Sequence, residues 1–289
     1  MCIDINDEVN KFKASINKGF KEMMDKEINE DVVEEAMYSG YLDTCRTINL
    51  KNISKENKDQ KKLIKAIFKK KENVLFKIVK VLTGKINSQE SFDNEHKELC
   101  EDLKNNFEKS GIKIFDGQAQ KIINMTFKYL YCIDSINKEH FRNCHMPLDR
   151  FTLEWIYRAC IFEKNLKPKF EEGAVVGDVW KKEGKVKKGA MGSWSSMEYS
   201  KKSDDKKCTY LFYLTLLSWE KELYLGKLSL LEFDFYIWPR MQKIIAAEEF
   251  IKAFNDDDNE IKCEDYKLEN LECTLQNKLK KVREIICSK

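Results

Sequence analysis

Residues 117–133 read GQAQKIINMTFKYLYCI, and most of this stretch is apolar. From Ile122 to Ile133 only Asn124, Thr126 and Lys128 interrupt an apolar run. A helix that is hydrophobic around most of its circumference is buried. We therefore predict a buried helix in this stretch, called the central helix below.

The composition favours an all-α fold with few or no strands. The chain of 289 residues contains only 11 Gly and 3 Pro, against about 20 and about 14 at average usage. Sandwiches, barrels and dinucleotide-binding folds need these residues in their turns and phosphate loops, so their scarcity argues against such folds. Hydrophobic residues make up 42% and charged residues 35%, which excludes a disordered chain and a membrane protein.

Apolar residues at helical spacing predict further helices on both sides of the central one. They cover 7–24, 31–41, 91–110, 203–223, 230–254 and 266–286. We expect an N-terminal helical lobe over 1–110 and a second lobe over 111–289, with a cleft between them. Residues 164–196 hold five of the glycines and an excess of lysine, which predicts a mobile basic loop.

Net charge selects no partner, because 52 Lys and Arg stand against 49 Asp and Glu and leave only +3. Positive charge is concentrated in residues 55–85, where 11 lysines face three acidic residues, 11 − 3 giving +8. A basic face on an amphipathic helix is suited to phosphate contact. An ordinary solvated face in a lysine-rich chain explains the same pattern equally well.

The cysteines predict no metal site and a reducing compartment. There are 10 cysteines and no C-x-x-C pair, so neither zinc nor an iron–sulfur cluster is supported, and we expect no cofactor. The first residues do not form a signal peptide, and no apolar run approaches the ~18 residues that span a bilayer. Free thiols without export signals indicate the cytoplasm.

Two lysines and one aspartate form the candidate catalytic group. Lys121 and Lys128 are seven residues apart, two helical turns, and therefore lie on one face of the central helix. A buried lysine loses its proton more readily, and a neutral amine is a nucleophile for Schiff-base chemistry. Asp149 stands at the start of the next predicted helix, where it accepts a proton from the lysine or serves as an N-cap. The alternative is that both lysines extend to water and Asp149 is only a cap.

The motifs around these residues resemble the active-site core of helix-hairpin-helix DNA glycosylases. They are the stretch 117–123, Lys128-Tyr129 and Met146-Pro147-Leu148-Asp149. In that family a hairpin ending in a glycine-containing turn presents the Schiff-base lysine at a helix start, and a Pro-x-Asp motif presents the catalytic aspartate as a helix cap. The archaeal 8-oxoguanine branch is the most similar, because it also has a second lysine two turns after the first.

That archaeal branch also places an acidic residue and a tryptophan four residues apart late in the chain, as Asp234 and Trp238 are here. Three features depart from the family pattern. Ala119 replaces the usual glycine two residues before the lysine, the loop between Lys121 and Asp149 is long, and the cysteines of the iron–sulfur glycosylases are absent. The loop 164–196 is foreign to the small archaeal enzymes.

The resemblance implies a DNA glycosylase and AP lyase of base-excision repair, acting on an 8-oxoguanine-like base flipped out of double-stranded DNA. It implies attack by Lys121 on the sugar, assisted by Asp149. The implied substrate-binding residues are Lys128, Pro147, Asp234, Trp238 and, beside the Pro-x-Asp motif, His145, which is otherwise a bystander. Trp194 lines the cleft or packs under the basic loop.

The implied protein is a monomer associated with the nucleoid in the cytoplasm, without metal, cofactor or membrane contact. Its basic loop 164–196 lies over the DNA. One alternative is a glycosylase that acts on modified bases of foreign (phage) DNA. The other is a non-catalytic helical module that binds nucleic acid or a protein.

Overall fold

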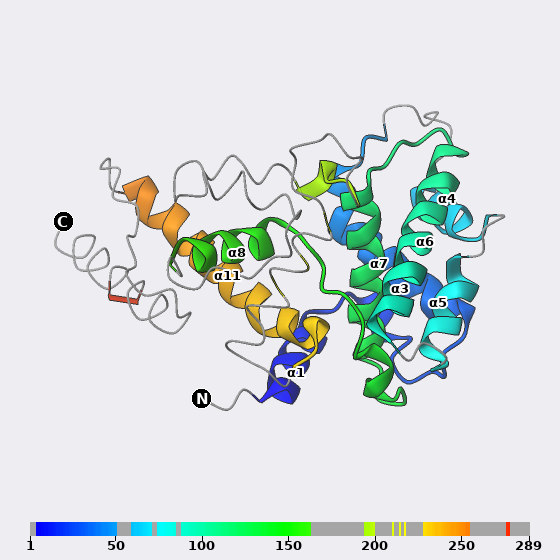
Figure 1. Cartoon of the computed structure of the whole chain (residues 1–289), viewed down its shortest axis with the longest axis horizontal. Helices are drawn as coiled ribbons and strands as arrows, with labels where there is room; N and C mark the ends of the chain where they lie inside the picture. The colour runs from blue at the N-terminus through cyan, green and yellow to red at the C-terminus, as the bar shows by residue number, and fades with distance from the viewer. Residues whose placement is uncertain are drawn as a thin grey trace. The chain divides into compact units, whose positions relative to one another are not determined.

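The computed structural model describes residues 4–50, 59–70, 74–84, 88–162, 194–199, 210, 214, 217, 228–254 and 276–277. Every regular element in these ranges is a helix, so the predicted all-α class is confirmed (Figure 1). The elements are α1 (Ile5–Ser15), α2 (Lys18–Lys21), α3 (Glu30–Thr44), η1 (Cys45–Thr47), α4 (Gln60–Phe68), α5 (Val74–Leu82), α6 (Gln89–Glu108), α7 (Asp116–Tyr131), η2 (Lys138–Phe141), α8 (Arg150–Phe162), η3 (Trp194–Ser196) and α11 (Leu230–Phe254).

The chain divides into two compact units. The first contains Met1–Asp149 and Gly192–Phe235, and the second contains Arg150–Met191 and Tyr236–Lys289. The first unit is therefore built from two separate stretches of chain. All of α1 to α7 and the first residues of α11 belong to it, and α8 belongs to the second unit.

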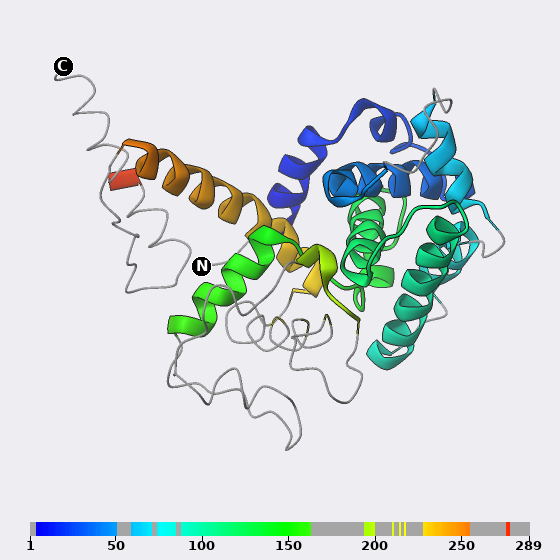
Figure 2. The same ribbon diagram turned by 90° about the horizontal axis from the view of Figure 1, so that it is seen from above.

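Helix α7 is the centre of the first unit, and it is buried, as the apolar run predicts. Every residue from Gly117 to Tyr131 is buried, and α3 and α6 pack against two of its sides (Figures 1 and 2). Helix α3 crosses α7 at Gly40, where an added Cβ would lie 2.7 Å from the carbonyl oxygen of Ile122. The absence of a side chain at Gly40 therefore permits the close approach of the two helices.

Local signals set the ends of α6. The Ser88 side chain accepts a hydrogen bond from the backbone N–H of Ser91 and caps the first turn. After the last turn Gly111 adopts a φ of 76°, which glycine tolerates without strain. The prediction of a helix here that glycine closes is confirmed.

The prediction of one continuous helix over 7–24 is wrong, because two helices, α1 and α2, occupy this range. The side chain of Asn17 accepts a hydrogen bond from the N–H of Phe20 and starts a separate helix, α2. Helix α3 begins slightly earlier than predicted, because Asn29 caps it and Asp31 lies inside its first turn. In both places a side chain that bonds the free amides of a first turn decides where the helix starts.

Helix α11 has the bounds that the sequence predicts, and it continues through Pro239, although the proline predicts an interruption there. Of the predicted helix over 203–223, the structure describes Tyr210, Leu214 and Leu217, which are helical and buried. The predicted helix over 266–286 and the basic loop over 164–196 lie outside the described residues, except for 276–277 and η3. No helix in the described ranges is long and apolar enough to span a bilayer.

Candidate active site

Lys121 and Asp149 form a buried ion pair. The Nζ atom of Lys121, in the second turn of α7, lies 3.1 Å from Oδ2 of Asp149, and the two residues are 8% and 4% exposed. Asp149 directly precedes α8, which begins at Arg150. The predictions that Asp149 stands at the start of this helix and lies within reach of the Lys121 amine are confirmed.

Trp194 covers the lysine of this pair. Its ring lies 4.7 Å from Nζ of Lys121, a distance at which an aromatic face attracts an ammonium group. Trp194 belongs to η3, and the segment after η3 is held on α7 because the N–H of Gly117 donates to the carbonyl of Met197. The structure thus places Trp194 beside the Lys121–Asp149 pair.

The first turn of α7 has no room for a side chain at Gly117, since an added Cβ would overlap the carbonyl oxygen of Trp194. Replacing a helical glycine with alanine normally stabilises a helix by about 0.5–1 kcal/mol. We expect Gly117→Ala to lower the free energy of unfolding instead, by about 1–3 kcal/mol. Urea denaturation followed by circular dichroism measures this, and a stabilised variant would contradict the close packing of η3 on α7.

A second buried ion pair joins Lys128 to Asp234 at the start of α11. Nζ of Lys128 lies 2.6 Å from Oδ2 of Asp234, and the residues are 1% and 0% exposed. The rings of Phe12 and Phe235 lie 4.5 and 4.8 Å from the same Nζ. Burial raises the pKa of the Asp234 carboxyl, although the Lys128 ammonium opposes this shift. Oδ1 of Asp234 is buried and has no hydrogen-bond partner among the residues that the structure describes.

The structure shows the second pair in a closed arrangement. The resemblance assigns Lys128 and Asp234 to the edge of a substrate base, whereas in the structure they bind each other and are closed to solvent. Any contact with a base requires this pair to open. Trp238, four residues after Asp234 on α11, belongs to the second unit, where its half-buried ring lies edge-on to Phe151 with centroids 5.7 Å apart.

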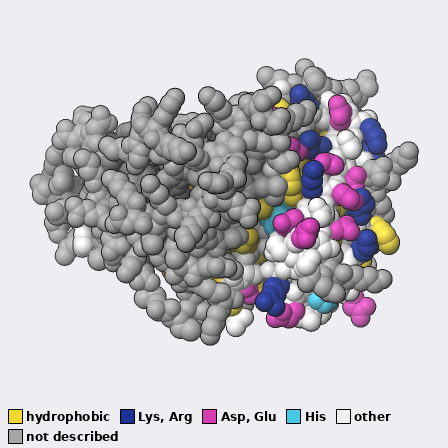
Figure 3. Space-filling view, in the orientation of Figure 1, with side chains coloured by type: hydrophobic (Ala, Val, Ile, Leu, Met, Phe, Trp, Pro, Cys, Tyr) yellow, Lys and Arg dark blue, Asp and Glu magenta, His cyan; other side chains and the backbone are white. Residues whose placement is uncertain are grey.

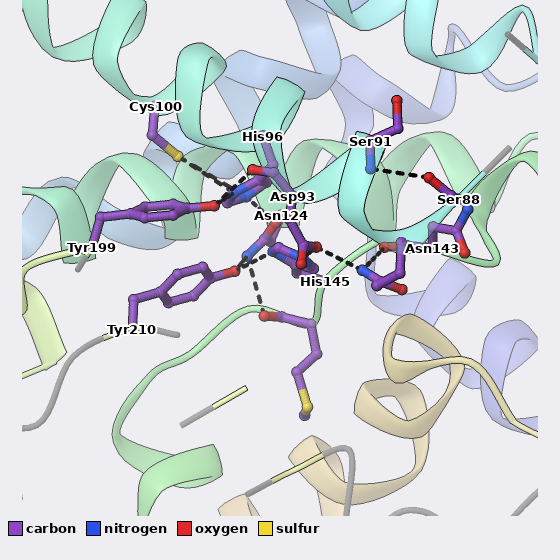
Figure 4. Close-up of polar contacts among 12 residues, drawn as sticks. Ser88, Ser91, Asp93, His96, Cys100, Asn124, Asn143, His145, Tyr199 and Tyr210 are labelled. Atoms are coloured by element: carbon purple, nitrogen blue, oxygen red, sulfur yellow. Dashed lines mark hydrogen bonds and ion pairs between the residues drawn. The ribbon is translucent and has the colours of Figure 1, made fainter. Parts of the chain in front are cut away.

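The interpretation of His145 as a DNA contact is also corrected. His145 is 1% exposed and therefore lies in the interior. Its Nε2 is 2.7 Å from Oδ1 of Asp93, and its Nδ1 is 2.9 Å from the Tyr210 hydroxyl (Figure 4). Pro147 is likewise buried, in the segment that leads to Asp149.

His145 belongs to a larger polar cluster next to α7 (Figure 4). His96 bonds through Nε2 to Oδ1 of Asn124 at 2.8 Å and through Nδ1 to the Tyr199 hydroxyl at 3.0 Å. The centroids of the two imidazole rings are 4.5 Å apart. Loss of hydration lowers the pKa of both histidines below 6.5, so both are neutral at pH 7.

The lowered pKa of His96 and His145 predicts a loss of stability in acid. In the unfolded chain both imidazoles take up protons near pH 6.5, whereas in the folded chain they resist protonation. The free energy of unfolding should therefore fall as the pH drops below about 6.5, by up to about 1.4 kcal/mol per pH unit for each histidine. Urea denaturation at pH 7.5 and pH 5.0 measures the fall.

The control for this pH dependence is the third histidine. His145→Gln should flatten the dependence between pH 7.5 and 5.0, whereas His140→Gln should leave it unchanged, because His140 is outside the cluster. Equal slopes in wild type and His145→Gln would contradict the assignment of this effect to the cluster.

Asp43 is a charged neighbour of the site that the sequence analysis misses. It lies at the end of α3, where its Oδ2 accepts a hydrogen bond of 2.9 Å from the hydroxyl of Tyr129. Desolvation raises the pKa of the Asp43 carboxyl, while the Tyr129 bond and the ammonium groups of Lys121 and Lys128 oppose the shift. No motif marks Asp43, because its position follows from the crossing of α3 and α7.

Lys61 and Lys65 of α4, and Lys69 directly after it, form ion pairs with α3. Lys61 and Lys65 lie 2.9 and 2.6 Å from Glu35 oxygens, and Lys65 and Lys69 also pair with Glu34. Figure 3 shows basic and acidic side chains interspersed over the described part of the face in view. These contacts favour a structural role for these three lysines over phosphate binding.

The described residues contain no group of three His, Cys, Asp or Glu side chains that could hold a metal ion. Comparisons of the chain with family models, with curated proteins and with solved structures found no match. The function is therefore argued from the geometry of the site.

Proposed function

We propose that the chain is a DNA glycosylase with AP-lyase activity that uses Lys121 as a Schiff-base nucleophile. The observation that carries the proposal is the buried Lys121–Asp149 pair under the ring of Trp194. An amine 3.1 Å from a carboxylate, largely withdrawn from water, has a proton acceptor in place. The helix-hairpin-helix glycosylase-like arrangement and a double-stranded DNA partner belong to the same proposal.

The pair supplies the groups that the reaction needs. Asp149 accepts a proton from Lys121, and the free electron pair of Nζ attacks C1′ of the flipped nucleotide. The bond from C1′ to the base breaks, and the base leaves with the bonding electrons and takes up the proton held by Asp149, which restores the carboxylate. The carboxylate opposes the positive charge on the attached nitrogen and sugar. A proton then moves from this nitrogen to O4′ as the C1′–O4′ bond breaks, which opens the sugar ring and leaves an iminium between C1′ and Nζ. Loss of a C2′ proton from the iminium expels the 3′ phosphate with the electrons of the C3′–O bond and cleaves the strand.

The second pair supports a role in base recognition. When Lys128 and Asp234 separate, they offer a charged donor and a carboxylate acceptor, and Oδ1 of Asp234 already lacks a partner. An oxidised purine such as 8-oxoguanine presents a ring N–H and a carbonyl oxygen that match these groups. A monomeric protein of the nucleoid, acting in base-excision repair, fits this chemistry.

Borohydride trapping tests the proposal. The wild-type chain is incubated with duplexes that carry 8-oxoguanine, uracil, 5-hydroxymethylcytosine or an abasic site, and with the unmodified duplex as control. We expect a covalent adduct on the abasic duplex and on at least one modified base. Peptide mapping should locate the adduct on Lys121. If DNA is bound but no duplex gives an adduct, the chain is a nucleic-acid-binding module.

A further inference from the structure

We propose that Gln120 is a positioning residue that holds Asp149 against Lys121, and that Asn124 supports it. The effect of this positioning on catalysis rests on the proposed function, whereas the hydrogen-bonded positions of Gln120, Asn124 and Asp149 are independent of it. Gln120 directly precedes Lys121 on α7, and Asn124 lies one helical turn after Gln120. Both side chains are fully buried.

The side-chain amide of Gln120 uses its whole bonding capacity. Its Nε2 donates to the carbonyls of Leu148 at 2.9 Å and Gly117 at 2.8 Å. Its Oε1 accepts from the backbone N–H of Leu148 at 3.3 Å and from Nδ2 of Asn124 at 3.0 Å. The N–H and the carbonyl of Leu148 are therefore both bound by one rigid group, and Leu148 is the residue before Asp149.

Asn124 extends this attachment along the same segment of chain. Its Nδ2 lies 3.1 Å from the carbonyl oxygen of Met146 and 2.8 Å from the Tyr210 hydroxyl, and its Oδ1 bonds His96 (Figure 4). The segment 146–148 is thus bonded to α7 at Met146 and at Leu148. The polar cluster that contains the two histidines fixes the orientation of the Asn124 amide.

These bonds link the nucleophile and its proton acceptor through one helix. Lys121 follows Gln120 directly on α7, and Asp149 follows Leu148 directly in the bound segment. The Gln120 amide therefore joins the backbone beside Lys121 to the backbone beside Asp149. This short connection fixes the 3.1 Å separation of Nζ and Oδ2. A displaced Leu148 moves Asp149 with it, and general-base catalysis depends on hydrogen-bond reach.

The test replaces a side-chain amide by a carboxylate, a change that keeps the number of non-hydrogen atoms the same. Gln120→Glu keeps an acceptor for the Leu148 N–H but places a carboxylate oxygen against the Leu148 carbonyl. Asn124→Asp does the same at Met146 and is the second test variant. Gln118→Glu is the matched control on the same helix, because the described hydrogen bonds of Gln118 join it to Thr47 and Phe115 and not to the segment 146–148.

The first readout is independent of any activity. Brief acetylation with acetic anhydride, followed by mass spectrometry, reports how accessible each lysine is. We expect Lys121 to react about fivefold faster in Gln120→Glu, the change given by one lost hydrogen bond of ordinary strength. Lys128 should stay protected in every variant, and Gln118→Glu should match the wild type at Lys121.

The second readout separates positioning from binding. At saturating enzyme, single-turnover adduct formation on the trapping duplex should be about 10–100-fold slower in Gln120→Glu. DNA affinity in a gel shift should remain unchanged.

Each outcome decides the inference. The inference is overturned if Lys121 is acetylated at the wild-type rate in folded Gln120→Glu. It is also overturned if Gln118→Glu shows the same increase in that rate as Gln120→Glu. If Gln120→Glu does not fold, Asn124→Asp decides by the same measurements, and wild-type behaviour of both readouts overturns the inference. If the wild type forms no adduct on any duplex but the acetylation result holds, the positioning stands and the proposed function fails.

Discussion

Replacing Lys121 with Gln should abolish the borohydride-trapped adduct and base release, while DNA binding and folding remain nearly intact. Glutamine keeps a donor toward Asp149 and fills a similar volume, but its amide nitrogen is not a nucleophile. In enzymes of known mechanism the loss of the nucleophile costs about 10³-fold or more in rate. Gel-resolved trapping and release of the modified base measure the loss, and a gel shift measures binding.

Two related variants serve as controls for this result. Lys128→Gln should still form the adduct at a reduced rate, because the second lysine is not the nucleophile. Asp149→Asn should slow the chemistry strongly and lower the free energy of unfolding by about 1 kcal/mol or less, through a weaker helix cap. If Lys121→Gln keeps full base release, Lys121 is not the nucleophile, and the proposal then needs an activated water.

Replacing Lys128 with Met should destabilise the fold by about 3–5 kcal/mol, because it leaves the carboxylate of Asp234 buried without a counter-charge. Burial already raises the pKa of Asp234, and removal of the ammonium raises it further. A carboxyl with a raised pKa binds its proton more tightly in the folded chain, so the stability of this variant should fall as the pH rises above about 4. Urea denaturation between pH 4 and 8 measures both effects.

The double variant Lys128→Met with Asp234→Leu is the matched control. Removing both charges eliminates the uncompensated carboxylate, so most of the lost stability should return, and the extra pH dependence should disappear. A loss below about 1 kcal/mol in the single variant would contradict the buried, tightly coupled pair.

Local patterns predict the central helix and the position of Asp149 at a helix start, whereas the expectation that Lys121 and Asp149 act together comes from the family resemblance. The apolar run of α7 indicates burial on all sides, and the position of Asp149 before an apolar helix indicates a cap. These signals need only neighbouring residues. The same reasoning finds α11 and the closure of α6 by Gly111, because propensity and capping act within a few residues.

The rest of the site depends on contacts between distant residues. Asp234 pairs with a lysine 106 residues earlier, and the sequence pattern links it only to Trp238 on its own helix. His145 follows a polar loop, yet partners 52 and 65 residues away draw it into the interior. No spacing rule reports such encounters, since they follow from how helices pack in three dimensions.

The division of the first unit into Met1–Asp149 and Gly192–Phe235 has a consequence for synthesis of the chain. Helix α7 is complete at residue 131, but Asp234 leaves the ribosome about a hundred residues later. Until then the Lys128 ammonium lacks the Asp234 carboxylate that it binds in the folded unit, and apolar surface of α7 has no cover from the later stretch. The first unit therefore finishes folding only after the whole stretch between its two parts has been made, and the nascent chain stays prone to aggregation in that interval.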